Sequence, residues 1–94
     1  KGSISVDQGA QTALRQGKSL LPAGITKIDG QFERGDLVVI LTETGAELGH
    51  GLAGHSSAEA DKLKGHNSKD FAMILGYECR AELIHADDLV LRHE

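Results

Sequence analysis

The stretch of this sequence that comes nearest to a known ligand-binding pattern is Gly49-His50-Gly51-Leu52-Ala53-Gly54, which has the spacing G-x-G-x-x-G. In a dinucleotide site this pattern follows a parallel strand and opens a helix whose N-terminus faces the pyrophosphate. Here the glycines fall in residues 47–53, which the pattern predicts to be a strand returning from a hairpin. We therefore expect them to let this strand bend and another backbone approach closely, and not to bind a nucleotide.

Histidine and serine side chains are the other candidates for chemistry. No pair of histidines has the H-x-x-x-H spacing of a helical metal site, and one cysteine cannot complete a zinc set. Ser56 with His55, His85 and Asp87 would supply the side-chain types of a hydrolytic triad, but no G-x-S-x-G elbow is present. We expect no catalytic residue, no metal ligand and no cofactor in this chain, and we expect its five histidines to be solvated: His50, His55, His66, His85 and His93.

Basic residues concentrate in the first third of the chain. The net charge is -4, yet residues 1–34 carry an excess of two positive charges and residues 35–94 an excess of six negative charges. A surface that binds a polyanion would therefore use residues of the first third, and ordinary solvated surface charges are the alternative. Aromatic residues for stacking bases are few. The candidate basic residues are Arg15, Lys18, Lys27 and Arg34.

The elements that would position these residues begin with a short alternating strand at 3–6. Asp7 has the side chain of a helix N-cap, residues 8–16 are compatible with a helix, and Gly17 supplies its left-handed end. Pro22-Ala23-Gly24 predicts a turn before the extended residues Ile25 and Ile28, and Arg34-Gly35-Asp36 predicts a tight turn.

Leu37-Val38-Val39-Ile40-Leu41 is the strongest predicted strand. A continuous β-branched and aliphatic run favours burial on both faces, so we expect it at the centre of the fold, with Val39 in the core. Residues 42–46 predict a hairpin connection to a glycine-rich strand at 47–53.

Two short helices and two strands are expected in the last part of the chain. Ser56 and Glu59 have capping-box spacing ahead of a helix ended by Gly65, and Phe71, Ile74 and Leu75 share one face of a second helix ended by Gly76. Strands are predicted at 81–84 and 89–91. Because strands and helices do not alternate regularly, we expect an α+β fold that is mainly β: a barrel-like sheet of mixed, mostly antiparallel strands.

The length of 94 residues predicts one domain over residues 1–94. The chain begins Lys1-Gly2, without a Met, which suggests a fragment of a longer protein. The single cysteine, Cys79, excludes an intrachain disulfide and favours a cytoplasmic origin. No apolar run approaches the ~20 residues of a membrane span, so we expect a soluble protein without membrane contacts.

Several blocks of the sequence resemble one family. Val6–Ala10, Gly17–Ile25 and Gly30–Asp36 are similar to the opening of the PUA domain of bacterial glutamate 5-kinases, and further short blocks follow in the family's order. The resemblance covers essentially the whole chain. It departs from the family at His55, where an aromatic residue is frequent, and at Ala86, where an arginine is common.

The resemblance implies a PUA pseudobarrel at the C-terminus of an enzyme that uses ATP and Mg²⁺ to phosphorylate the γ-carboxylate of glutamate, the first step of proline synthesis. The family's catalytic residues lie in an N-terminal amino-acid-kinase domain that is absent here. The implied role is that of an accessory or regulatory module whose partners are that kinase domain and other subunits. In other PUA proteins the domain binds RNA, and by position that surface would include Arg15, Lys18, Ser19 and the segment 20–25.

Overall fold

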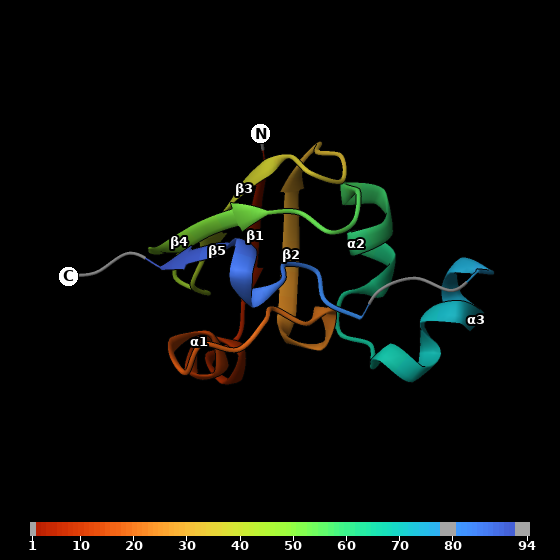
Figure 1. Ribbon diagram of the computed structural model, residues 1–94, viewed down its shortest axis with the longest axis horizontal. Coiled ribbons are helices and arrows are strands. Elements are labelled where there is room, and N and C mark those ends of the chain that lie inside the picture. Colours follow the sequence, from red (N-terminus) through yellow and green to blue (C-terminus); the bar gives the residue numbers. More distant parts are fainter. Residues whose placement is uncertain (1, 78–80, 92–94) are drawn as a thin grey trace.

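The computed structural model describes residues 2–77 and 81–91 (Figure 1). Its elements, in chain order, are β1 (Gly2–Val6), α1 (Gln8–Arg15), η1 (Pro22–Gly24), β2 (Ile25–Gly30), β3 (Leu37–Leu41), β4 (Glu47–Leu52), α2 (Ser57–Leu63), η2 (Ser68–Asp70), α3 (Phe71–Leu75), η3 (Ala86–Asp88) and β5 (Leu89–Leu91), where η marks a 3-10 turn. Cys79 lies outside the described residues.

The strands form one curved sheet in the order β2-β1-β3-β4-β5. β1 and β3 run parallel, and the three other neighbouring pairs are antiparallel. The described strands do not close into a barrel, although an isolated bridge between Leu20 and Ile84 joins two segments outside the sheet. The prediction of a mixed, mostly antiparallel sheet with β3 at its centre is confirmed.

The capping signals act as the sequence predicts. Asp7 accepts a hydrogen bond from the backbone N–H of Ala10 at 2.8 Å and so satisfies a free donor of α1. Ser56 Oγ accepts from the N–H of Glu59 at 3.2 Å at the start of α2. Gly17, with a φ of +83°, supplies the predicted left-handed residue after α1.

β3 differs from its prediction, because only one of its faces is fully buried. Val38 and Ile40 are buried, whereas Val39 and Leu41 are half-buried and Leu37 is 52% exposed. A strand places alternate side chains on opposite faces of the sheet. The core residues of β3 are therefore Val38 and Ile40, and the expectation that Val39 belongs to the core is wrong.

The strand predicted at 81–84 is not formed. In this segment only Ile84 makes a β-bridge, to Leu20, and Leu83 and Ile84 are both fully buried. The apolar side chains on which the strand prediction was based lie in a loop and pack into the core. The strand predicted at 89–91 is confirmed as β5.

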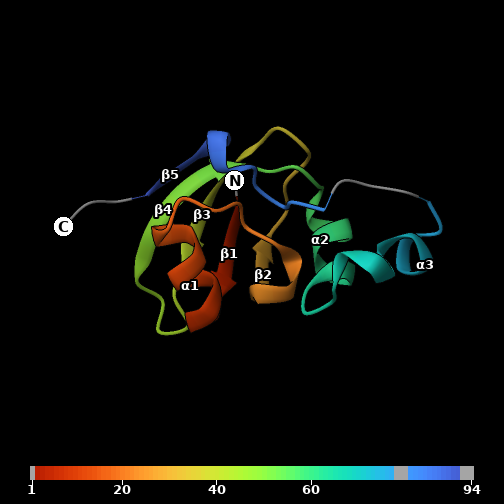
Figure 2. The same cartoon turned by 60° about the horizontal axis from the view of Figure 1, so that its bottom comes forward.

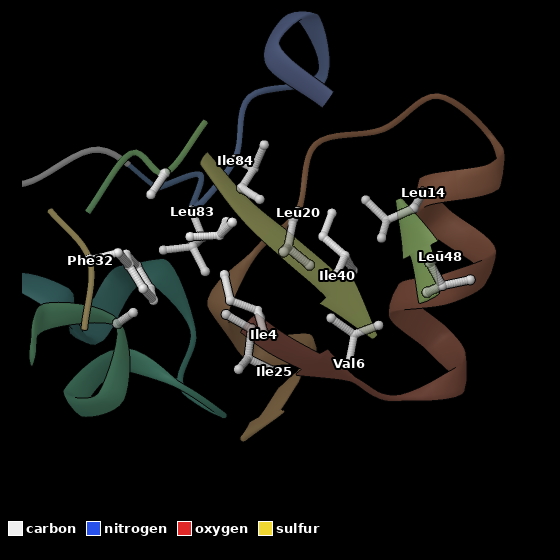
Figure 3. Close-up of a cluster of buried hydrophobic side chains, with 13 residues drawn as sticks. Ile4, Val6, Leu14, Leu20, Ile25, Phe32, Ile40, Leu48, Leu83 and Ile84 are labelled. Atoms are coloured by element: carbon white, nitrogen blue, oxygen red, sulfur yellow. The ribbon is translucent and has the colours of Figure 1, made fainter. Parts of the chain in front are cut away.

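The core lies on the concave face of the sheet (Figure 3). Leu14 from α1 and Leu20, Leu83 and Ile84 from loops pack against the inward side chains of β1 and β3. α2 and α3 lie together beyond β2, while α1 lies apart from them (Figures 1 and 2). The core cluster consists of Ile4, Val6, Leu14, Leu20, Ile25, Phe32, Val38, Ile40, Leu48, Ala53, Ala60, Leu83 and Ile84.

Candidate functional site

A groove of about 330 Å³ lies between α1 and the segment that leads into η1. The two walls touch closely, because Asp7 donates its backbone N–H to the carbonyl of Gly24 at 2.9 Å. A Cβ on Gly24 would lie 2.5 Å from the Cβ of Ala10, so only glycine lets the two walls approach this closely. The groove is lined by Asp7, Gly9, Ala10, Ala13, Lys18, Ser19, Leu20, Leu21, Ala23 and Gly24.

The lining of this groove is mostly apolar. Most of its lining is aliphatic or glycine, and Lys18 is its one cation. The carboxylate of Asp7 is engaged as the helix cap, and Ser19 Oγ accepts a hydrogen bond from the N–H of Ala86 at 2.9 Å. The groove can therefore hold a small apolar or planar group beside one positive charge.

The structure gathers some of the predicted basic residues and separates others. Arg15 is exposed in the last turn of α1, and Lys18 and Ser19 follow it on the groove wall. Lys27 lies on β2, where its Nζ is 3.5 Å from Asp29 Oδ2. β2 pairs Ile25 with Val6 near α1 and Gly30 with Gly2 at the far end of the sheet. Arg34, in the loop after Gly30, is therefore remote from the groove.

The glycines of the G-x-G-x-x-G string serve strand packing, as predicted. Gly49 and Gly51 lie in β4, which is antiparallel to both of its neighbours. A Cβ on Gly49 would lie 2.2 Å from the carbonyl oxygen of Val90, and one on Gly51 would lie 2.9 Å from that of Asp88. The neighbouring backbone therefore approaches this strand closely, which only glycine allows at these two positions.

A polar contact that the sequence analysis missed joins α2 to the residues on either side of it. His55 is 2% exposed, which corrects the expectation that all the histidines are solvated. Its Nδ1 lies 3.4 Å from Glu59 Oε1, and the hydroxyl of Tyr77 donates a hydrogen bond to Glu59 Oε2. The spacing of four residues between His55 and Glu59 was a usable signal, whereas nothing in the sequence indicated Tyr77.

These contacts lower the pKa of Glu59. The hydrogen bond from Tyr77 is the largest cause, and the contacts with His55 and with the backbone N–H of Ser56 act in the same direction. Partial burial opposes them. The bond from Ser56 also completes the capping box predicted at the start of α2.

The described residues contain neither a cluster of metal ligands nor a membrane-spanning helix. Within 2–77 and 81–91, no group of three or more His, Cys, Asp or Glu side chains is placed to hold a metal ion. The Nδ1 atom of His85 is already engaged, since it accepts a hydrogen bond from the backbone N–H of Asp87 at 3.1 Å. In the same ranges, no helix has the length and apolar character needed to cross a bilayer.

The comparisons with known proteins agree with this architecture. The family model for the PUA domain matches residues 2–75. The chain belongs to the PUA domain family. The glutamate 5-kinases of Rhodopseudomonas palustris strain TIE-1 and of Brucella anthropi are each 53% identical to this PUA domain over 91 residues. That match covers 97% of the chain and 24% of each kinase, so the chain spans about a quarter of these relatives and corresponds to their C-terminal region.

Solved structures show the same fold. A PUA domain from Aeropyrum pernix K1, in complex with tartrate, has a TM-score of 0.66 and 28% identity, covering 90% of this chain and 41% of that one. A chain of an H/ACA ribonucleoprotein bound to a substrate RNA has a TM-score of 0.62 and 25% identity, covering 92% of this chain and 25% of that one. The predicted PUA fold is confirmed, in the form of an open sheet.

Proposed function

We propose that this PUA domain is the non-catalytic accessory module of a glutamate 5-kinase. The observation that carries the proposal is the identity of 53% along 97% of the chain with enzymes of that name, in register with their C-terminal quarter. In this proposal a kinase region precedes the domain in the same chain, in the cytoplasm. The domain acts on that region, and on other subunits of the enzyme, through surface contacts.

The proposal places ATP, Mg²⁺ and glutamate in the kinase region. The only nucleotide-like string in the domain, 49–54, lies in an antiparallel strand with the backbone of β5 against it. No cluster of metal-ligating side chains occurs in the described residues. The groove beside α1 lacks the paired acid and base that hydrolytic chemistry would use. Phosphoryl transfer to a carboxylate does not need such a pair, so this observation argues only against hydrolysis.

The test compares the full-length enzyme with a variant that lacks this domain. We expect glutamate-dependent ADP release to persist without the domain, because the reacting groups lie elsewhere, and we expect its kcat or its KM for glutamate to change. The isolated domain should release no ADP. Loss of all activity through a single substitution in the groove, such as Ser19→Ala, would contradict a non-catalytic role. Deletion of the domain without any kinetic effect would contradict an accessory role.

RNA binding is the second proposal, and one specific observation favours it. Arg15, Lys18 and Ser19 lie together at the end of α1, beside a groove that can accept a planar group. A structural neighbour with 25% identity belongs to a ribonucleoprotein bound to RNA. The net charge of -4 opposes long-range attraction of phosphate, so this proposal calls for weak binding that depends on a few local contacts.

A further inference from the structure

The convex face of the sheet carries exposed apolar side chains across three strands. Leu37 of β3 pairs with Leu52 of β4, and these side chains are 52% and 44% exposed. In the next row on the same face, Val39 pairs with His50, and His50 pairs with Val90 of β5, which is 55% exposed. We call Leu37, Val39, His50, Leu52 and Val90 the outer-face patch.

The patch residues alternate along their strands with residues that face the core. The residues that alternate with the patch on β3 and β5 face the core: Val38 and Ile40 are fully buried, and Leu89 and Leu91 pack against the core cluster. On β4 the alternating positions are Gly49 and Gly51. A sheet face that meets only water would favour polar side chains at such positions, so three half-exposed aliphatic residues in adjacent strands indicate a contact surface.

The point where the chain enters the domain lies at the same end of the sheet. β1 runs parallel to β3, and Gly2 is in register with Val38, the residue after Leu37. A segment that precedes β1 therefore arrives next to the pair formed by Leu37 and Leu52.

We propose that the outer-face patch is the surface on which the preceding kinase region of the same chain docks. This inference rests on the proposed function, in which relatives four times as long as this domain supply that region. A covalent tether holds the two parts at an effective concentration in the millimolar range, so a small apolar patch is enough to keep them together. The complementary surface should be apolar at its centre.

The size and charge of the patch argue against the other occupants. A stable dimer of separate chains uses roughly 20–30 residues on each side, many more than this patch provides. A nucleic acid would need cations on the same face, but Lys27, which lies two strands away from the patch on β2, is paired with Asp29 at 3.5 Å. A second copy is kept as an outcome of the test.

The test is side-chain footprinting of the intact full-length enzyme with a photoactivated carbene. Met73 on α3 is the internal reference, because its side chain is 89% exposed and lies outside the patch. In the full-length enzyme we expect Leu37 and Leu52 to be labelled at least ~5-fold less than in the free domain, where both side chains are half-exposed. The reason is that the centre of a docked interface excludes water and, with it, the labelling reagent. Labelling in proportion to that exposure would overturn the proposal. Protection that disappears on dilution would identify a second copy instead and would also overturn it.

A pair of variants separates docking from folding and from catalysis. In the full-length enzyme, Leu37→Glu with Leu52→Glu should restore labelling of Val90. The matched substitution Leu21→Glu, at a leucine that is 49% exposed outside the patch, should leave labelling of Val90 unchanged, and both variants keep Met73 as the reference. Equal labelling of Val90 in both variants would overturn the proposal. Glutamate-dependent ADP release is measured separately: its absence from the unmodified enzyme would refute the proposed function, while patch protection would still report whether the preceding region docks here.

Discussion

The hydroxyl of Tyr77, just beyond α3, donates a hydrogen bond to Oε2 of Glu59 in α2, 18 positions earlier in the chain. Glu59 thereby receives contacts from both sides, since His55 lies 3.4 Å from its other oxygen. This relationship fixes the end of α3 against α2 and connects a buried histidine to a half-exposed tyrosine.

Tyr77→Phe should raise the pKa of Glu59, because it removes the largest cause of the lowered pKa and leaves partial burial to oppose the rest. A lowered pKa in the folded state stabilises the fold above the ordinary value of 4.5, and this stabilisation is lost as the pH falls through the folded pKa. The variant should therefore lose stability at neutral pH, by no more than about 1 kcal/mol, and lose less on acidification. Carbon-13 NMR titration of the Glu59 carboxyl measures the pKa, and urea unfolding at neutral pH and at a pH below the folded pKa measures the change in stability. An unchanged pKa in the variant would show that Tyr77 does not act on Glu59 in solution.

Val38→Ala and Val39→Ala form a matched pair at adjacent positions of β3. Val38 is fully buried, so removing two methyl groups should lower the free energy of unfolding by about 2–3 kcal/mol, from lost burial and the cavity left behind. Val39 is half-buried on the opposite face, and its truncation should have less than about half that effect. Urea unfolding of the two variants measures the difference. Equal losses would mean that the two faces of β3 are equally buried in solution.

Gly49→Ala should destabilise the pairing of β4 with β5. The new Cβ would lie 2.2 Å from the carbonyl oxygen of Val90, so one of the two backbones must move, at a cost of about 1–3 kcal/mol. Gly9→Ala is the control, because a Cβ at this position of α1 would meet Asp7 Oδ1 at an ordinary contact distance of 3.5 Å and alanine is the better helix former. Hydrogen exchange of the β5 amides should accelerate in the first variant only. Unchanged exchange at Gly49→Ala would refute the close approach.

Much of the fold follows from local signals in the sequence. The helix ends were predictable from single residues. The side chains of Asp7 and Ser56 accept hydrogen bonds from free N–H groups at helix starts, and the positive φ of Gly17 and Gly76 ends the helices that precede them. Strand β3 was evident from its composition, but which of its faces is buried depends on partners that are distant in sequence. For the same reason, residues 81–84 form a buried loop and not a strand, since Leu20 offers a single bridge there.

The candidate site was predictable only in part, for a related physical reason. Arg15, Lys18 and Ser19 are neighbours in sequence, so their proximity needed no tertiary information. Lys27 and Arg34 are close to them in sequence, but the direction of β2 carries Arg34 to the other end of the sheet. Burial of His55 depends on tertiary packing at the start of α2, which periodicity does not encode.

RNA binding should be weak, sensitive to salt and dependent on the end of α1. Two cations at the groove, Arg15 and Lys18, would neutralise about two phosphates, and each contributes a slope near ~0.7 in log affinity against log salt on a single strand. The total slope should therefore be about 1–2 in magnitude, with an affinity weaker than micromolar near physiological salt. Fluorescence anisotropy with a labelled single-stranded RNA across a salt series measures both quantities. Arg15→Glu with Lys18→Glu should abolish the signal, whereas Arg34→Glu, a reversal of the same kind at the remote end of the sheet, should reduce it only through the change in net charge. Nanomolar binding that survives the double reversal would place the RNA surface elsewhere on the domain and would remove the groove beside α1 as its site.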